Sequence, residues 1–131
     1  MLFEENEKVT VFDSRMAVGG VRFLVQEARK YEKEGMEVSL VSGDRDLLQI
    51  ASDTIKIRIP KTKGGKTEIE DYYAKDVEAA YQVTPLQFIE LKALMGDSSD
   101  NIPGVPGIGP KTAISLIQRY GTVENLYKNL L

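Results

Sequence analysis

The chain has 131 residues, of which 42% are hydrophobic and 28% charged, and this size and composition are typical of one soluble globular domain. It contains neither cysteine nor histidine and has a net charge of −3. The missing residue types exclude disulfides, thiolate metal sites and histidine-based acid–base chemistry. The net charge argues against a uniformly basic nucleic-acid-binding protein but is compatible with a local basic face. No apolar run is long enough to span a bilayer, and residues 1–20 lack the order of a signal peptide. The lack of cysteine fits an intracellular protein.

The first part of the chain carries signals for a helix and two strands. Lys8–Phe12 is compatible with a short strand. Apolar residues then recur at helical spacing over Val21–Glu34, and Gly35 is expected to stop this helix. Val38–Val41 follows as a short buried strand. A helix that leads directly into a strand favours an α/β layer.

A second group of elements follows the Val38–Val41 strand. Asp46–Ile50 has the pattern of a short helix, and the isoleucines of Ile55–Ile59 alternate with basic residues, which predicts a half-buried strand. Pro60–Lys66 is predicted to be a turn-rich basic loop. From Lys56 to Lys66 there are five basic residues and no acidic one. A solvated strand face ending in a hairpin tip is the simpler interpretation of this run, and a binding surface is the alternative.

The rest of the chain is predicted to be helical. Thr84, Pro85 and Gln87 form a strong helix start, with an N-cap, a proline at the first position and a side chain that reaches back. This helix, to about Met95, is apolar on much of its circumference, so we expect it to lie in the core. Three other segments are predicted as helices: Ala74–Gln82, Lys111–Tyr120 and about Val123–Leu130.

Ile102–Ala113 is the most informative stretch of the sequence. Three glycines and three prolines in eight positions exclude both a helix interior and a central strand. We expect Ile102, Val105 and Ile108 to fix this tight loop on the core, with Pro110 at the first position of the next helix. The alternative is a turn that merely connects two helices, but the repeated glycine spacing followed by Lys-Thr-Ala makes it the weaker interpretation.

A glycine-rich loop that leads into a helix presents free backbone N–H groups at the positive end of the helix dipole, which suits a phosphate. Lys111 and Thr112 add a charge and a hydroxyl, and nothing here reads bases, so binding should be sequence-independent and salt-sensitive. The pattern resembles the helix–hairpin–helix of DNA repair and replication proteins, in which the glycine amides hold the DNA backbone. The predicted DNA-binding residues are Gly104, Val105, Gly107, Ile108, Gly109, Lys111 and Thr112.

Carboxylates form two clusters that flank the buried helix. Asp44 and Asp46 come just after a predicted strand end, where α/β proteins place ligand sites, and Asp97 and Asp100 are close enough for one turn to direct both the same way. Together the four could hold Mg²⁺ or Mn²⁺, which prefer oxygen ligands. For either cluster alone, a helix cap or a polar turn is the simpler interpretation. Their order, running straight into the hairpin, favours the metal site.

Val41–Ile50 and Ala93–Ala113 closely resemble the 5′–3′ exonuclease domain of bacterial DNA polymerase I, a family that includes flap endonucleases and is related to PIN-like nucleases. The resemblance runs from about Ala28 to the C-terminus. It implies an α/β fold, in which a partial PIN-like sheet layer (residues 1–70) precedes an all-helical helix–three-turn–helix, or helix–hairpin–helix, subdomain (residues 71–131).

The same resemblance implies an activity and its cofactors. The family hydrolyses phosphodiesters with Mg²⁺ and removes 5′ flaps and RNA primers during replication and repair, using two metal ions that typically sit about 3.5–4 Å apart. It implies that Asp44, Asp46, Asp97 and Asp100 are metal ligands or outer-sphere partners. It further implies K⁺ at hairpin carbonyls such as those of Val105 and Ile108, duplex or 5′-flap DNA and the polymerase portion of the same protein as partners, and a location in the bacterial cytoplasm.

The beginning of the chain departs from the family pattern. Counting back from Gly35, the positions of the family's E-A-D-D motif fall on Gly19–Arg22, none of which is acidic. About half of the family's metal-binding acids have no counterpart here, so we expect a truncated, rearranged or frame-disturbed start. The expectation is a chain that binds duplex or flap DNA and one weak Mg²⁺ but hardly cleaves. A missing half would also expose a sheet edge and favour self-association.

Two other functions compete with this interpretation. A non-catalytic helix–hairpin–helix module would keep the hairpin and use the aspartates only as caps. A haloacid-dehalogenase-like phosphatase would use Asp44 and Asp46 after a strand, together with Asp97, but it leaves the hairpin unexplained and needs a larger core.

Overall fold

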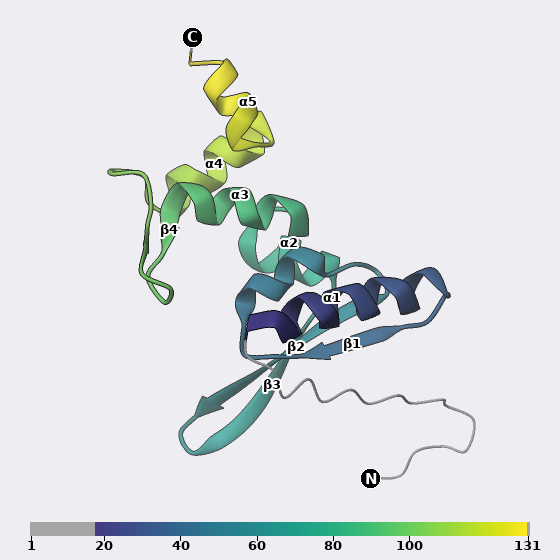
Figure 1. Cartoon of the computed structure of the whole chain (residues 1–131). Coiled ribbons are helices and arrows are strands. Elements are labelled where there is room, and N and C mark those ends of the chain that lie inside the picture. Colours follow the sequence, from purple (N-terminus) through teal and green to yellow (C-terminus); the bar gives the residue numbers. More distant parts are fainter. Residues whose placement is uncertain (1–17, 131) are drawn as a thin grey trace, which may run out of the picture.

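The computed structural model describes residues 18–130, so the strand expected at Lys8–Phe12 lies outside the described residues. A small sheet carries α1 across one face, and a run of helices leads away from this layer to the C-terminal end of the chain (Figure 1). The combination of a sheet layer with a helical part confirms the predicted α/β class. No helix within residues 18–130 is long and apolar enough to cross a membrane.

Helix α1 (Val18–Lys33) begins earlier than the predicted Val21. It ends as predicted, since Gly35 has φ +81° and turns the chain toward the sheet. Ala28 is buried, and Leu24 and Val25 pack beside it against the core of the sheet layer.

The sheet has the strand order β1-β2-β3, with β1 (Val38–Val41) parallel to β2 (Ile55–Lys63) and β2 antiparallel to β3 (Lys66–Tyr72). The predicted alternation in β2 is confirmed, because Ile55, Ile57 and Ile59 are all buried. The expectation of a buried β1 is wrong. Leu40 is buried there, but Val41 is 64% exposed.

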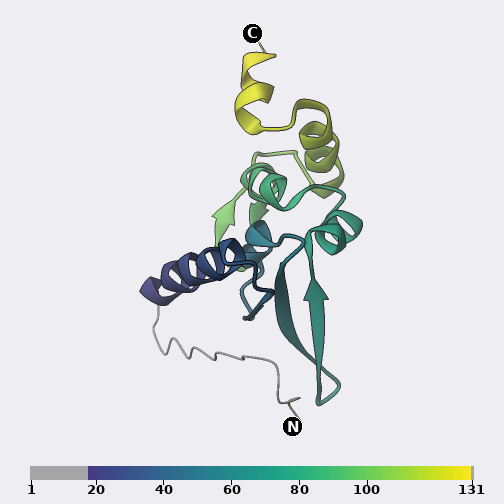
Figure 2. The ribbon, with the colours of Figure 1, turned by 90° about the vertical axis from the view of Figure 1, so that its right-hand side faces the viewer.

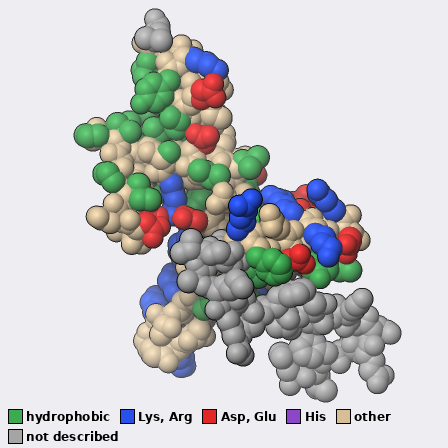
Figure 3. Space-filling view, in the orientation of Figure 1, with side chains coloured by type: hydrophobic (Ala, Val, Ile, Leu, Met, Phe, Trp, Pro, Cys, Tyr) green, Lys and Arg blue, Asp and Glu red, His purple; other side chains and the backbone are tan. Residues whose placement is uncertain are grey.

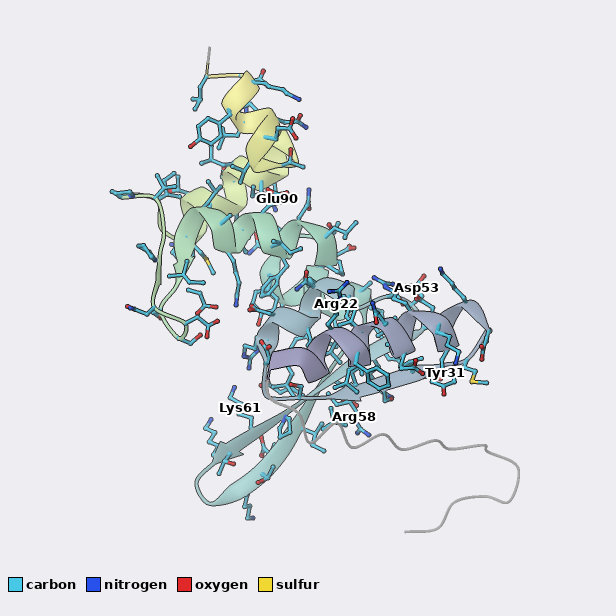
Figure 4. The ribbon with its side chains drawn as sticks, viewed as in Figure 1. Arg22, Tyr31, Asp53, Arg58, Lys61 and Glu90 are labelled. Carbon is cyan, nitrogen blue, oxygen red and sulfur yellow. The ribbon has the colours of Figure 1, made fainter. Side chains whose placement is uncertain are left out.

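The predicted loop at Pro60–Lys66 is a strand pair, which confirms the simpler interpretation of the basic run as a solvated strand face that ends in a hairpin tip. Pairing of β2 with β3 continues to Lys63 and Lys66, and Gly64 and Gly65, with φ +59° and +78°, make the two-residue turn. This β2–β3 hairpin projects beyond the rest of the sheet, and Lys61 lies on its side (Figures 2 and 4). Lys66–Tyr72 was not predicted as a strand because most of its residues are polar and exposed, so no apolar alternation marks it.

Helices α2 (Ala74–Tyr81) and α3 (Pro85–Met95) follow. The predicted start of α3 is confirmed: the Thr84 side chain accepts the N–H of Gln87, and the Gln87 side chain accepts the N–H of Thr84. The expectation that α3 lies in the core holds only for one face. Leu86 is 73% exposed and Ile89 is 48% exposed.

Helix α3 joins two hydrophobic clusters. Its Phe88 belongs to the cluster under the sheet, whereas Leu91 and Leu94 belong to a second cluster with α4 (Pro110–Tyr120) and α5 (Val123–Lys128). The Glu90 carboxylate, which lies between α3 and the last helices in Figure 4, accepts the N–H of Val123 at 2.9 Å. One rigid helix therefore fixes the helical part relative to the sheet. The second cluster is formed by Val83, Leu91, Leu94, Ala113, Ile117 and Leu126.

Candidate functional site

The first acidic pair lies where β1 ends. Asp44 is the N-cap of the short helix η1 (Arg45–Ile50), and its Oδ1 accepts the N–H of Asp46 at 2.9 Å. Leu47 and Leu48 of this helix are buried and anchor it to the sheet layer. Capping and burial together position the Asp46 side chain beside Lys92 in the C-terminal half of α3.

The second acidic pair lies where α3 ends. Gly96 terminates the helix with φ +78°, and β4 (Gly96–Asp97) pairs with β5 (Ile102–Pro103). Oδ1 of Asp97 accepts the N–H of Ser99 at 3.0 Å and also the Ser99 hydroxyl. The carboxylate of Asp97 is therefore held in a defined orientation at the start of the hairpin segment.

The structure brings three of the four predicted acids together. Carboxylate oxygens of Asp46, Asp97 and Asp100 all lie within 4.8 Å of one another. Asp44 is not a member of this group, but it lines a pocket of about 490 Å³ together with Lys92 and Asp100. Three clustered carboxylates offer the hard oxygen ligands that Mg²⁺ and Mn²⁺ prefer, so this donor set fits one divalent ion. Acidic and basic side chains lie close together on the face of the molecule that Figure 3 shows.

Lys92 lies within the acidic group, although no sequence pattern singled it out. Its ammonium donates to Oδ1 of Asp46 and to Oδ2 of Asp97, and it lies 5.5 Å from the centroid of the Phe88 ring. Burial alone would lower the pKa of Lys92, but the two carboxylates raise it above its usual value. Lys92 and Ser99 together lower the pKa of Asp97 to about 2. A lysine in an otherwise mostly apolar helix was the available signal.

A hydrogen-bonded group of polar side chains, centred on Arg45, lies beside the acids. Arg45 donates to the Tyr81 hydroxyl at 2.9 Å and to Glu70 at 3.0 Å. Lys61 and Arg45, followed by Tyr72, lower the pKa of Glu70 to about 2. Lys61 and Arg45 both form ion pairs with the Glu70 carboxylate. Glu70 therefore links the β2–β3 hairpin to Arg45, which lines the pocket.

The segment after Asp97 folds back tightly on the end of α3. A Cβ at Gly104 would lie 2.3 Å from the carbonyl carbon of Met95, and a Cβ at Gly96 would lie 2.4 Å from the nitrogen of Gly104. The N–H of Val105 donates to the carbonyl oxygen of Leu94 at 2.8 Å. Both glycines are therefore required by close backbone contact.

The hairpin is fixed by its backbone more than by its apolar side chains. Ile102 is 55% exposed and Val105 is 42% exposed, so the expectation that they anchor the loop on the core is wrong; Ile108 does pack on the second cluster. The N–H groups of Val105 and Ile108 donate within the protein, to Leu94 and to Val105 respectively.

The predicted binding amides at the start of α4 have no acceptor within the described part of the chain. They are the N–H groups of Gly107, Gly109, Lys111 and Thr112, which lie before and within the first turn of α4. Lys111 and Thr112 are exposed at this helix N-terminus. Free N–H groups, a helix dipole and a lysine together form an arrangement suited to an anion.

The chain is similar in sequence to known 5′-3′ exonucleases and DNA polymerases. Residues 83–131 match the family model described as 5′-3′ exonuclease, C-terminal SAM fold. DNA polymerase I of Bacillus caldotenax is 52% identical over 79% of this chain, and that of Bacillus subtilis is 48% identical over the same share. The chain spans 12% of the length of each of these relatives.

A solved structure extends the likeness to the sheet layer. The bacteriophage T5 5′-exonuclease with bound zinc is 28% identical, with a TM-score of 0.72 over 85% of this chain and 39% of that one. A T5 flap endonuclease in a pseudo-enzyme–product complex with DNA and metal ions is also 28% identical, with a TM-score of 0.70 over 82% of this chain and 38% of that one. Residues 83–131 thus belong to the 5′-3′ exonuclease family with its C-terminal SAM fold, and the chain is similar to a part of bacterial DNA polymerase I.

Proposed function

We propose that this chain binds the phosphate backbone of duplex or 5′-flap DNA through Ile102–Ala113, as part of a metal-dependent 5′–3′ exonuclease. The observation that carries the proposal is the set of N–H groups at the start of α4 that have no acceptor among residues 18–130, beside the exposed Lys111. Relatives of this family support it, since a T5 flap endonuclease is bound to DNA and metal ions. Backbone amides and lysines contact phosphates and do not distinguish base pairs, so binding is independent of sequence.

The carboxylate group is the proposed metal site of the same function. Asp46, Asp97 and Asp100 would hold one Mg²⁺ or Mn²⁺, with Asp44 as an outer partner. A bound divalent ion would supply an activated water or stabilise a leaving oxygen during phosphodiester hydrolysis. Asp97 and the hairpin are linked through the β4–β5 pair, in which Asp97 faces Ile102. The proposed metal site and the proposed DNA-binding loop are thus joined through this strand pair.

The finer features of the family are proposals of the same kind. They comprise a K⁺ ion on the hairpin carbonyls, the polymerase portion of a longer protein as a partner, a place in the bacterial cytoplasm, and self-association through the edge of the sheet. The Val105 carbonyl already accepts the N–H of Ile108, so a K⁺ ion there would share that oxygen.

A non-catalytic DNA-binding module is the second candidate, and one observation favours it. Lys92 already forms ion pairs with two of the three clustered acids, and such pairing also stabilises a purely structural cluster. A titration with Mn²⁺ separates the two functions. A saturable site supports the nuclease, and its absence supports the module.

Replacing Lys111 with alanine tests the proposed contact with DNA. We expect affinity for two duplexes of unrelated sequence to fall by the same factor, about five- to tenfold, and the slope of log K against log salt to decrease by about one. Fluorescence anisotropy over a salt series measures both. Lys75→Ala, which removes an exposed lysine on α2, is the control and should leave both quantities unchanged. A loss confined to one sequence would contradict phosphate recognition.

A further inference from the structure

Lys92 occupies the centre of the acidic group as an internal cation. Its ammonium bonds to carboxylates from two different elements, Asp46 on η1 and Asp97 at the end of α3. Within residues 18–130, Lys92 is the cation that forms an ion pair with either of them. The side chain is only 21% exposed, and its ammonium lies over the Phe88 ring. Lys92 is thus held in place by packing as well as by charge.

We propose that Lys92 competes with the divalent metal ion for Asp46 and Asp97 and thereby weakens metal binding at this site. This inference rests on the proposed function, because it concerns the metal site of that function. A metal ion and an ammonium use the same carboxylate oxygens, and the two cations repel each other at such short range. The ion must therefore displace Lys92 or bind beside it at reduced affinity.

The hydrogen bonds of Asp97 show why the competition is direct. Its Oδ2 accepts from Lys92, and its Oδ1 accepts from the N–H and the hydroxyl of Ser99. Both oxygens of this carboxylate are thus engaged. Oδ1 already accepts two bonds, so a metal ion that leaves the Ser99 bonds intact binds Asp97 at Oδ2, either in place of Lys92 or beside it. Removal of the Lys92 charge would relieve the repulsion at that oxygen.

The test is a titration of Mn²⁺ into the full chain. Binding is measured by calorimetry or by the electron paramagnetic resonance signal of free Mn²⁺. Lys92→Met keeps the length and the apolar stem that packs on Phe88 but removes the charge. We expect its Kd for Mn²⁺ to fall by about tenfold relative to the unmodified chain. Lys75→Met makes the same change of net charge at an exposed site on α2, and its Kd should stay unchanged.

The outcomes separate this inference from the proposed function. If Lys92→Met does not fold, as judged by circular dichroism, the neutral Lys92→Gln carries the same expectation. If the folded variant binds Mn²⁺ no more tightly than the unmodified chain, the proposed competition is wrong. If Asp97→Asn nevertheless abolishes Mn²⁺ binding to the unmodified chain, the proposed metal site is still supported. If neither the unmodified chain nor the variant binds Mn²⁺, the metal site fails and the inference fails with it. DNA binding through the hairpin is measured separately and does not depend on either result.

Discussion

A Gly104→Ala variant is expected to lose about 3 kcal/mol of unfolding free energy, because a methyl group there has no space. Its Cβ would lie 2.3 Å from the carbonyl carbon and 2.4 Å from the carbonyl oxygen of Met95. These are backbone atoms at the end of α3, so no side chain can move aside. Relief requires the hairpin to separate from α3, which would break the bond from the Val105 N–H to the Leu94 carbonyl. Urea denaturation followed by circular dichroism measures the loss.

Gly109→Ala is the matched control in the same hairpin. Gly109 has an ordinary φ of −88°, and a Cβ added there would meet no atom within 4 Å. The cost should therefore stay below about 1 kcal/mol and reflect the N-cap alone. The same separation of hairpin from α3 should lower DNA affinity in Gly104→Ala even where the variant remains folded. Equal stability of the two variants would show that the contact of Gly104 with Met95 does not hold the hairpin.

An Asp97→Asn variant is expected to lower Mn²⁺ affinity by at least about tenfold, because it removes one negative charge from the carboxylate group. Asparagine keeps the carbonyl oxygen that accepts the Ser99 N–H, so the turn after α3 should be preserved. Calorimetric titration of the variant and the unmodified chain measures the change.

Asp53→Asn is the control for that substitution, since Asp53 is an exposed carboxylate outside the acidic group (Figure 4). Its Mn²⁺ affinity should match that of the unmodified chain. Unchanged affinity in Asp97→Asn would place the bound ion elsewhere.

In a cleavage assay on a 5′-flap substrate, we expect little product from the chain itself. Robust Mg²⁺-dependent cleavage that Asp97→Asn abolishes would contradict this expectation.

Local sequence signals predicted the features that local physics determines. The capping box of Thr84 and Gln87 depends on residues three apart, and the burial of alternate residues in Ile55–Ile59 follows from the period of a strand. The position of Pro110 at the start of α4 likewise follows from its missing N–H group. Each of these features requires only neighbours in the chain.

Features that depend on distant contacts could not be predicted in the same way. Lys92 meets Asp46 across 46 positions of sequence, and no periodic pattern signals which charge a lysine will reach. The Val105 N–H was expected to be free for a ligand, but the fold-back at Gly104 directs it to Leu94. Leu86 has the same apolar character as Leu91, yet its face of α3 is left uncovered.

The convergence of the acids lies between these two cases. Order along the chain predicted that Asp46, Asp97 and Asp100 would share a site, and the structure places their oxygens within 4.8 Å of one another. The order of residues along the chain could not show that Asp44 lies outside this group, since the different roles of Asp44 and Asp46 depend on which of the two caps η1. A capping bond uses one carboxylate oxygen and directs the side chain toward its own helix.

Backbone amides before and within the first turn of α4 are the groups proposed to hold the DNA phosphate. An amide ¹H–¹⁵N correlation spectrum recorded during titration with a short duplex tests this contact at individual residues. We expect the largest shifts at Gly107, Gly109, Lys111 and Thr112, and the same set of shifts with a duplex of unrelated sequence. Shifts that cluster on another surface, with these four amides unmoved at saturation, would contradict it.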